Sequence, residues 1–181
     1  MEVLKTDFPG LLRLRPKVFG DQRGHFMETF NEMAFARSTG IAVRFVQDNQ
    51  SRSKAGVLRG LHWQAPPHAQ AKLVSVAAGA VLDVCVDLRP DSPSFGKHFK
   101  LRLDDRDHEM LFIPEGMAHG FLALENDTVF TYKCSAYYEP SAERSIRWND
   151  PDLNIDWGIK DPLVSDKDRA GITFAESRWG K

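Results

Sequence analysis

The sequence has 181 residues, of which 42% are hydrophobic and 27% are charged, and its formal net charge is -1. This length and balance predict one globular domain over residues 1–181, and the low net charge argues against bulk binding to nucleic acid or to an anionic membrane surface. No apolar run reaches the ~18 residues of a membrane-spanning helix. Met1 to Pro9 lack the apolar stretch of a signal peptide.

The two cysteines, Cys85 and Cys134, each lie in an apolar run. That placement indicates a pair of reduced core thiols rather than a disulfide or a metal site. Together with the missing targeting signals, it leads us to expect a cytoplasmic protein.

Taken in chain order, the pattern predicts one early helix and then mostly short strands. The helix is expected over Asn31–Thr39, with Asn31 as N-cap and Gly40 just past its end. Gly79 and Asn126-Asp127 lie between predicted strands as hairpin turns would. Strands at this spacing are typical of a sandwich or barrel, and a short helix is expected after Ser165. The clearest strands are Val57–Gln64, Lys72–Ala77, Ala80–Leu88, Met110–Pro114, Gly120–Leu124 and Thr128–Ala136.

Two basic side chains lie within these apolar strands. His62 is one, and a histidine in a strand is structural more often than catalytic. Lys72 has the same parity as Val74 and Val76, so it should share their face of the pleat. If that face is inward, Lys72 is a buried ammonium that needs a partner. Alternatively, it reaches solvent from the start of its strand.

Three more polar residues each have a functional and a structural interpretation. His119 follows a Pro-Gly turn that feeds a strand, which places it near the mouth of a barrel. Tyr132 shares parity with Phe130 and Cys134, a pattern that most often means core packing. Ser165 and Asp168 have the spacing of a capping box, in which the acid bonds back to the N-cap backbone.

In order along nearly the whole chain, a set of motifs resembles the dTDP-4-dehydrorhamnose 3,5-epimerase family of the cupin superfamily. One motif alone is weak, but the ordered set is specific. Trp63 stands where Tyr or Phe is usual, and no such departure falls on an expected catalytic residue. The main motifs are Asp21-Gln22-Arg23-Gly24-His25-Phe26, Gln47-Asp48-Asn49-Gln50-Ser51, Arg59-Gly60-Leu61-His62, Gln70-Ala71-Lys72, Pro114 to Phe121, Tyr132-Lys133-Cys134 and Ser165 to Asp168.

The resemblance implies a mainly β fold, a cupin-type jelly-roll barrel with a few short helices. Metal-dependent cupins carry His-x-His and a downstream Glu in their first motif, but here it contains His62-Trp63-Gln64 followed by the basic Lys72. One imidazole, an amide and an ammonium make a poor site for a divalent ion. We therefore expect neither a metal nor another cofactor.

The same resemblance implies an isomerase that moves protons beside the C4 ketone of a dTDP-4-keto-6-deoxyhexose. His62 would be the base, and Asp168 would bond its second nitrogen, which competes with the capping interpretation. Lys72 would stabilise the enolate oxygen, and Tyr132 would return the proton from the other face.

Further residues are implied to bind the sugar or the nucleotide. Arg23 and Arg59 suit the diphosphate, although ordinary surface salt bridges are the alternative. Arg59 and His62 have opposite strand parity, so a bulge at Gly60 is needed to bring both to one site. Family members are homodimers, and residues from the early part of the chain are expected to reach the partner's site. The complete implied binding set is Arg23, Phe26, Glu28, Gln47, Asn49, Arg59, Lys72, His119, Glu143 and Lys167.

The sequence leaves several functions open. The first is the 3,5-epimerase of dTDP-L-rhamnose biosynthesis, and the second is a relative that inverts only C3 or only C5. A non-catalytic sugar-binding cupin and a metal-dependent cupin are the remaining alternatives.

Overall fold

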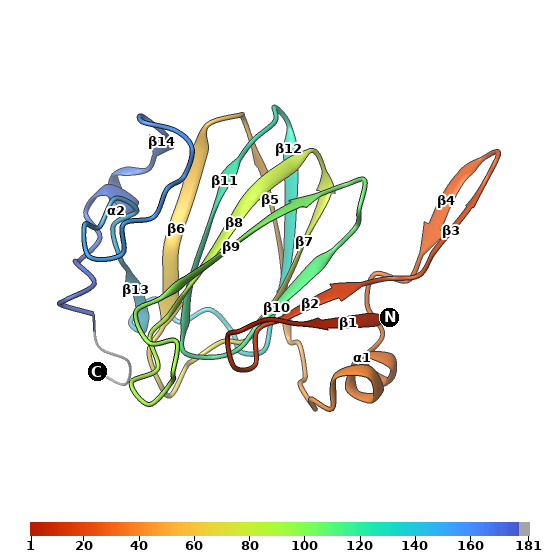
Figure 1. The fold of residues 1–181 in the computed structure, drawn as a ribbon, viewed down its shortest axis with the longest axis horizontal. Helices are drawn as coiled ribbons and strands as arrows, with labels where there is room; N and C mark the ends of the chain where they lie inside the picture. Colours follow the sequence, from red (N-terminus) through yellow and green to blue (C-terminus); the bar gives the residue numbers. More distant parts are fainter. Residues whose placement is uncertain (178–181) are drawn as a thin grey trace.

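A computed structural model describes residues 1–177, so residues 178–181 of the domain expected over 1–181 lie outside the described part. Nearly all of the described secondary structure is strand (Figure 1). The strands are β1 (Glu2–Lys5), β2 (Leu12–Arg15), β3 (Val18–Asp21), β4 (Gly24–Met27), β5 (Gln47–Ser53), β6 (Val57–Gln64), β7 (Lys72–Ala78), β8 (Ala80–Asp87), β9 (His98–Asp104), β10 (Met110–Ile113), β11 (Met117–Ala123), β12 (Thr128–Cys134), β13 (Glu143–Ser145) and β14 (Leu163–Val164).

Two large sheets face each other across an apolar core. One has the strand order β1-β2-β10-β7-β12-β5, and the other has the order β13-β6-β11-β8-β9 with β14 beside β6. Every large-sheet pairing is antiparallel except that of β14 with β6. Val74 and Phe130 from the first sheet meet Cys85 and Phe121 from the second in the enclosed core. The mainly β jelly-roll barrel expected from the sequence is confirmed.

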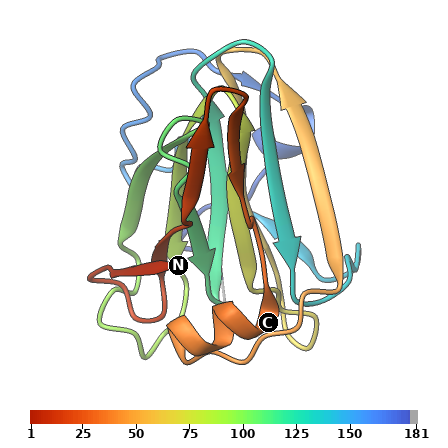
Figure 2. The same ribbon diagram turned by 90° about the vertical axis from the view of Figure 1, so that its right-hand side faces the viewer.

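The helices begin and end where their capping residues predict. In α1 (Glu32–Thr39), Asn31 accepts a hydrogen bond from the Ala34 backbone, and Gly40 takes a left-handed conformation at the end. The helix lies at the lower end of the barrel in both ribbon views (Figures 1 and 2). In α2 (Asp166–Arg169), Ser165 is the N-cap. Both expected helices are therefore confirmed.

Both predicted hairpins are wrong. Gly79 joins β7 to β8, and Asn126-Asp127 lie between β11 and β12, but each pair of strands is divided between the two sheets. A turn residue permits the chain to reverse without fixing which strand it pairs with afterwards. In this barrel both turns instead carry the chain from one sheet to the facing one.

The C-terminal part of the chain covers the outer face of the second sheet. Val84 and Val86 alternate with the inward Cys85, and they pack in a separate buried cluster with Leu153 and Trp157. This packing holds α2 and β14 beside β6 (Figure 1). Residues far along the sequence are thereby brought to the edge of the barrel's interior.

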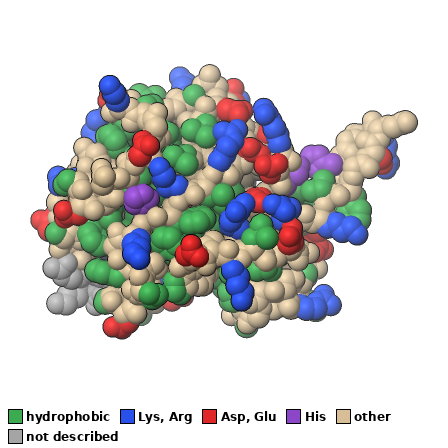
Figure 3. All heavy atoms as spheres, in the orientation of Figure 1, with side chains coloured by type: hydrophobic (Ala, Val, Ile, Leu, Met, Phe, Trp, Pro, Cys, Tyr) green, Lys and Arg blue, Asp and Glu red, His purple; other side chains and the backbone are tan. Residues whose placement is uncertain are grey.

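A two-stranded arm made of β3 and β4 projects from the barrel (Figures 1 and 3). Phe19 and Phe26 are cross-strand partners in the arm, and their exposed fractions are 53% and 69%. No helix within residues 1–177 has the length and apolar character needed to cross a membrane.

Candidate active site

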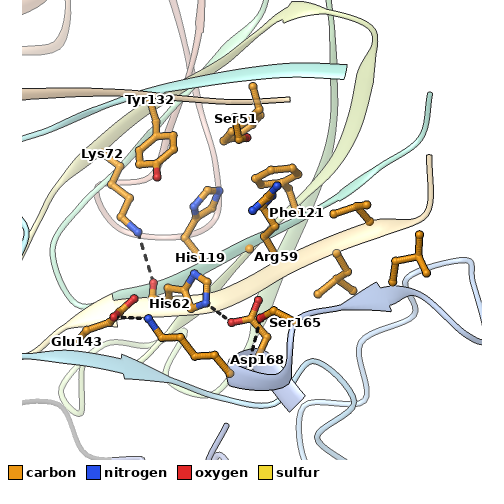
Figure 4. Close-up of a pocket in the computed structure, with 16 residues that line it drawn as sticks. Ser51, Arg59, His62, Lys72, His119, Phe121, Tyr132, Glu143, Ser165 and Asp168 are labelled. Atoms are coloured by element: carbon orange, nitrogen blue, oxygen red, sulfur yellow. Dashed lines mark hydrogen bonds and ion pairs between the residues drawn. The ribbon is translucent and has the colours of Figure 1, made fainter. Parts of the chain in front are cut away.

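A cavity of about 500 Å³ opens between the two sheets, and Figure 4 shows the side chains around it. Its walls combine strands of both sheets with α2 and the segment leading into it. The lining residues are Ser51, Val57, Leu58, Arg59, His62, Lys72, His119, Gly120, Phe121, Phe130, Tyr132, Glu143, Leu163, Ser165, Lys167 and Asp168.

An irregularity in β6 lets Arg59 and His62 share this cavity despite their opposite parity. His62 is the Cα partner of His119, and Arg59 is the partner of Phe121, so β6 has one more residue than β11 between these pairs. Gly60 has a φ of 126°, and a Cβ there would lie 2.5 Å from the Cα of Gly120. Only glycine fits so close to the neighbouring strand. The bulge expected at Gly60 is present.

His62 and Asp168 form a hydrogen-bonded pair at one wall. His62 Nε2 lies 2.5 Å from Asp168 Oδ1, and the Gly60 backbone N–H donates to the other carboxylate oxygen. Burial alone would raise the pKa of Asp168, but its hydrogen bonds with the His62 imidazole and the Gly60 backbone N–H help to lower it overall. The carboxylate is therefore kept ionised beside the imidazole.

The two sequence interpretations of Asp168 are compatible in the structure. Ser165 Oγ accepts a hydrogen bond from the Asp168 backbone N–H, so the helix is capped as its sequence predicts. The Asp168 side chain does not complete a capping box, since its carboxylate hydrogen-bonds to His62 and to the Gly60 backbone N–H. The backbone N–H of Asp168 takes part in the helix cap, and its carboxylate hydrogen-bonds to His62 in the wall of the cavity.

Lys72 is buried, with an exposed fraction of 9%, so it does not reach solvent from the start of β7. Its Nζ lies 3.5 Å from the backbone oxygen of His62. Burial lowers the pKa of Lys72, because an ammonium loses its hydration inside the barrel. Within the described residues, no carboxylate lies close enough to Lys72 to form an ion pair. The ammonium is therefore available to an anionic partner.

Tyr132 lies on β12 in the first sheet, while His62 lies on β6 in the second. Figure 4 shows the Tyr132 hydroxyl directed into the cavity alongside Lys72. Burial raises the pKa of Tyr132, so its phenol stays protonated at neutral pH. A proton donor and an imidazole therefore occupy opposite walls of one cavity.

His119 is more deeply placed than a residue at a barrel mouth, the position that its preceding turn suggested. It is buried within β11, and its Nε2 lies 2.8 Å from Asp83 Oδ2 on β8. Burial lowers the pKa of His119, and the charge of Asp83 only partly opposes this effect.

The rim near α2 is a network centred on Glu143. Its carboxylate accepts a hydrogen bond from the Tyr138 hydroxyl at 2.6 Å and forms an ion pair with Lys167. Burial alone would raise the pKa of Glu143, but these two partners lower it overall.

The other candidate binding residues fall into two groups. Gln47 and Asn49 line an adjoining cavity of about 270 Å³, which shares His62, Lys72 and Tyr132 with the larger one.

Arg23, Phe26 and Glu28 do not reach this cavity within the same chain. The first two lie on the arm, and Glu28 follows it. The Arg23 side chain is 89% exposed and pairs with Asp21.

Two residues at the site were absent from the sequence prediction. Asp83 is fully buried and hydrogen-bonds to His119, and an acid in the middle of the otherwise apolar strand β8 was the available signal. Tyr138 follows the strand β12 and had no such signal, since its place depends on the fold around Glu143. Within residues 1–177, no group of three or more His, Cys, Asp or Glu side chains is arranged to hold a metal ion.

The fold and cavity define a cupin-type barrel equipped for acid–base chemistry. The family model described as dTDP-4-dehydrorhamnose 3,5-epimerase matches residues 5–176. The chain belongs to this family.

Individual relatives match over most of the chain. The dTDP-4-dehydrorhamnose 3,5-epimerase of Shigella flexneri is 49% identical over 179 residues, with 99% of each chain covered. The structure of the dTDP-6-deoxy-D-glucose-3,5-epimerase from Legionella pneumophila in complex with dTDP-4-keto-L-rhamnose has a TM-score of 0.92 at 44% identity, covering 97% of this chain and 93% of that one. A 3'-monoepimerase from Streptomyces bikiniensis in complex with dTDP-quinovose has a TM-score of 0.89 at 35% identity, covering 97% and 88%.

Proposed function

We propose that this chain epimerises dTDP-4-dehydro-6-deoxy-D-glucose at C3 and C5 to dTDP-4-dehydro-L-rhamnose, as a step of dTDP-L-rhamnose biosynthesis. The observation that carries the proposal is the placement of His62 and Tyr132 on opposite walls of one cavity, with Lys72 between them and Asp168 bonded to the imidazole. Epimerisation beside a ketone needs a base, an acid on the opposite face and a group that stabilises the enolate oxygen.

His62 is the proposed base. The hydrogens on C3 and C5 are acidified by the neighbouring C4 ketone, and the imidazole removes one of them to form an enolate. Asp168 fixes the tautomer of His62 and stabilises the imidazolium that results, because its ionised carboxylate already bonds Nε2.

Lys72 and Tyr132 complete the proposed cycle. The enolate carries its charge on O4, and this oxyanion is the partner that the buried Lys72 ammonium lacks. The protonated Tyr132 phenol returns a proton to carbon from the face opposite His62 and so inverts the centre. The barrel side chains supply base, acid and oxyanion stabilisation, and the proposal includes no cofactor.

The nucleotide half of the substrate needs cationic partners. Arg59 lines the cavity, and within residues 1–177 no carboxylate is close enough to form an ion pair with it. Its guanidinium is therefore available to a diphosphate. Gln47, Asn49, Glu143 and Lys167 lie around the same opening and are proposed to contact the substrate. His119 is proposed to bind the sugar.

We further propose that the working form is a homodimer, in which the arm of a second copy brings Arg23, Phe26 and Glu28 to the cavity. The projecting arm and the exposed Phe26 support this arrangement, since an isolated apolar arm gains little stability from its own chain. Co-expressing His62→Asn and Arg23→Ala chains tests it by complementation. Mixed dimers should regain activity at the one cavity that has both intact residues. Activity no higher than that of either variant alone contradicts exchange of the arm.

The site of action is proposed to be the cytoplasm, because both cysteines are free thiols, as is usual in a reducing compartment. The cavity takes residues from Ser51 through Asp168, so we also propose that the chain acts as one catalytic domain.

The second candidate function is inversion at C3 or C5 alone, since a 3'-monoepimerase has a closely similar fold. Incubation with dTDP-4-dehydro-6-deoxy-D-glucose in deuterium oxide, followed by proton NMR, separates the candidates. The proposed function predicts deuterium at both carbons and the L-rhamno product. Exchange and inversion at one carbon only would establish the monoepimerase, and binding without exchange would establish a non-catalytic sugar-binding protein.

A further inference from the structure

Asp83 and His119 form a second imidazole–carboxylate pair inside the barrel. Nε2 of His119 and Oδ2 of Asp83 are 2.8 Å apart. Asp83 has an exposed fraction of 0%. Among the described residues, the other hydrogen bond to its carboxylate is a long contact from the Cys85 thiol. A carboxylate in such a place needs a strong partner, and His119 is that partner.

The direction of this hydrogen bond fixes what His119 offers to the cavity. A carboxylate accepts and does not donate, so Nε2 carries the hydrogen. In a neutral ring the other nitrogen, Nδ1, is then an acceptor. Nδ1 forms no hydrogen bond within residues 1–177, but it is not completely enclosed. His119 also lines the cavity. The Nδ1 lone pair is therefore left without a partner among the described residues.

The surroundings favour the neutral ring. Burial lowers the pKa of His119, the neighbouring Lys72 ammonium lowers it further, and Asp83 opposes this only in part. During turnover His62 would acquire a proton from carbon, which would disfavour a second imidazolium next to it. Each imidazole is hydrogen-bonded to a carboxylate, but only His119 is enclosed beside Lys72 in the interior of the barrel.

We propose that Asp83 is a positioning residue for the epimerisation: it holds His119 in the Nε2–H tautomer, so that Nδ1 accepts a hydrogen bond from a sugar hydroxyl beside the ketone. This inference rests on the function proposed above. It divides the tasks between the two imidazoles. His62 removes a proton from carbon, and His119 orients the sugar without changing its own protonation.

The first test is ¹⁵N NMR of the histidine rings in the dTDP-bound wild-type protein at neutral pH, which needs no turnover. The expected signals for His119 are those of a neutral ring protonated at Nε2. An imidazolium, or a neutral ring protonated at Nδ1, would overturn the proposal. If the protein fails to epimerise the sugar at all, the proposed function is lost, but this measurement still decides how Asp83 acts on His119.

The second test substitutes Asp83→Asn, with Asp87→Asn as the matched control. Both aspartates are fully buried on β8, but Asp87 bonds Arg89, Ser92 and Ser94 and does not touch the cavity. Loss of the hydrogen-bond partner that orients a metal-binding histidine typically costs about 10–100-fold in activity, and by analogy kcat/KM should fall by about that factor in Asp83→Asn only. Affinity for dTDP should be unchanged. An equal loss in both variants would mean that burial, and not His119, explains the effect.

A double-mutant cycle separates positioning from an independent role. If Asp83 acts through His119, adding Asp83→Asn to His119→Gln should produce no further loss of kcat/KM. Losses that multiply in the double variant would overturn the proposal. Circular dichroism of all the variants establishes that they are folded, and the wild-type NMR result stands if one of them is not.

Discussion

His62 on β6 and His119 on β11 are directly opposite each other in the sheet. Each imidazole is hydrogen-bonded to a carboxylate that belongs to a third element. Asp168 approaches from α2, and Asp83 approaches from β8. The arrangement is near-symmetric in partners but not in accessibility, since His62 has a side-chain exposure of 30% and His119 one of 7%. The more accessible imidazole is the better placed of the two to exchange its proton with solvent.

Replacing His62 with Asn should abolish hydrogen exchange at both carbons while dTDP still binds. General-base catalysis typically contributes about 10²–10⁴-fold, and the rate should fall by at least that factor. Deuterium incorporation measured by NMR reports exchange, and calorimetric titration reports binding. Near wild-type exchange in His62→Asn would rule out this residue as the base.

Replacing Asp168 with Asn should reduce kcat strongly, because the imidazolium loses the charge that stabilises it. Asp166→Asn is the matched control: Asp166 is an exposed acid in the same short helix, and Asp168, not Asp166, is hydrogen-bonded to His62. Its kcat should be unchanged. Steady-state rates on the two variants provide the comparison. Equal losses in both would show that the helix, and not the imidazole, depends on these acids.

Tyr132→Phe should separate proton removal from inversion. His62 can still remove a proton and return deuterium to the same face, so the sugar should take up solvent deuterium with little formation of epimer. The substitution keeps the ring and its packing, so a cavity cannot explain the loss. The measurement is the ratio of deuterium incorporated to epimer formed. Inversion at the wild-type rate in Tyr132→Phe would show that Tyr132 is a packing residue and not the proton donor.

Lys72→Met should remove activity without loss of stability. Methionine has a similar length, and removal of a buried ammonium eliminates its desolvation cost, so Tm should stay constant or rise. In parallel, wild-type turnover should be insensitive to EDTA, because Lys72 is proposed to stabilise O4. Loss of turnover in EDTA that one particular metal restores would contradict this role for the lysine.

Asp87 should make stability fall in acid. Burial by itself would raise the pKa of Asp87, but hydrogen bonds from Arg89, Ser92 and Ser94 bring it to about 2, below the ordinary value of 3.8 for an aspartate. A depressed native pKa stabilises the fold above about pH 4, and this contribution is lost as pH falls toward 2. It amounts to roughly 2 kcal/mol at neutral pH.

Urea unfolding of wild type and Asp87→Asn over a pH series measures this contribution. The difference in unfolding free energy should be largest at neutral pH and should shrink on acidification. A difference that is constant with pH would mean that the Asp87 charge does not contribute.

The sequence by itself determined the features that depend on near neighbours. The parity of Lys72 with Val74 and Val76 put all three on the inner face of β7, where each is buried. Asn31 and Ser165 marked the starts of both helices, because a cap acts within one turn. The pairing of His62 with Asp168 came from the resemblance to a family, since nothing local joins residues that lie 106 positions apart.

Only the tertiary structure decided which strands pair and which polar groups meet. Gly79 looked like a hairpin turn, yet it carries the chain between sheets, because sheet membership depends on distant strands that compete for the same backbone hydrogen bonds. Asp83 gained its function from His119 on a neighbouring strand, and local sequence does not encode that contact. Arg23 and Phe26 were placed on an arm away from their own cavity, because the direction of the arm is set where it leaves the barrel.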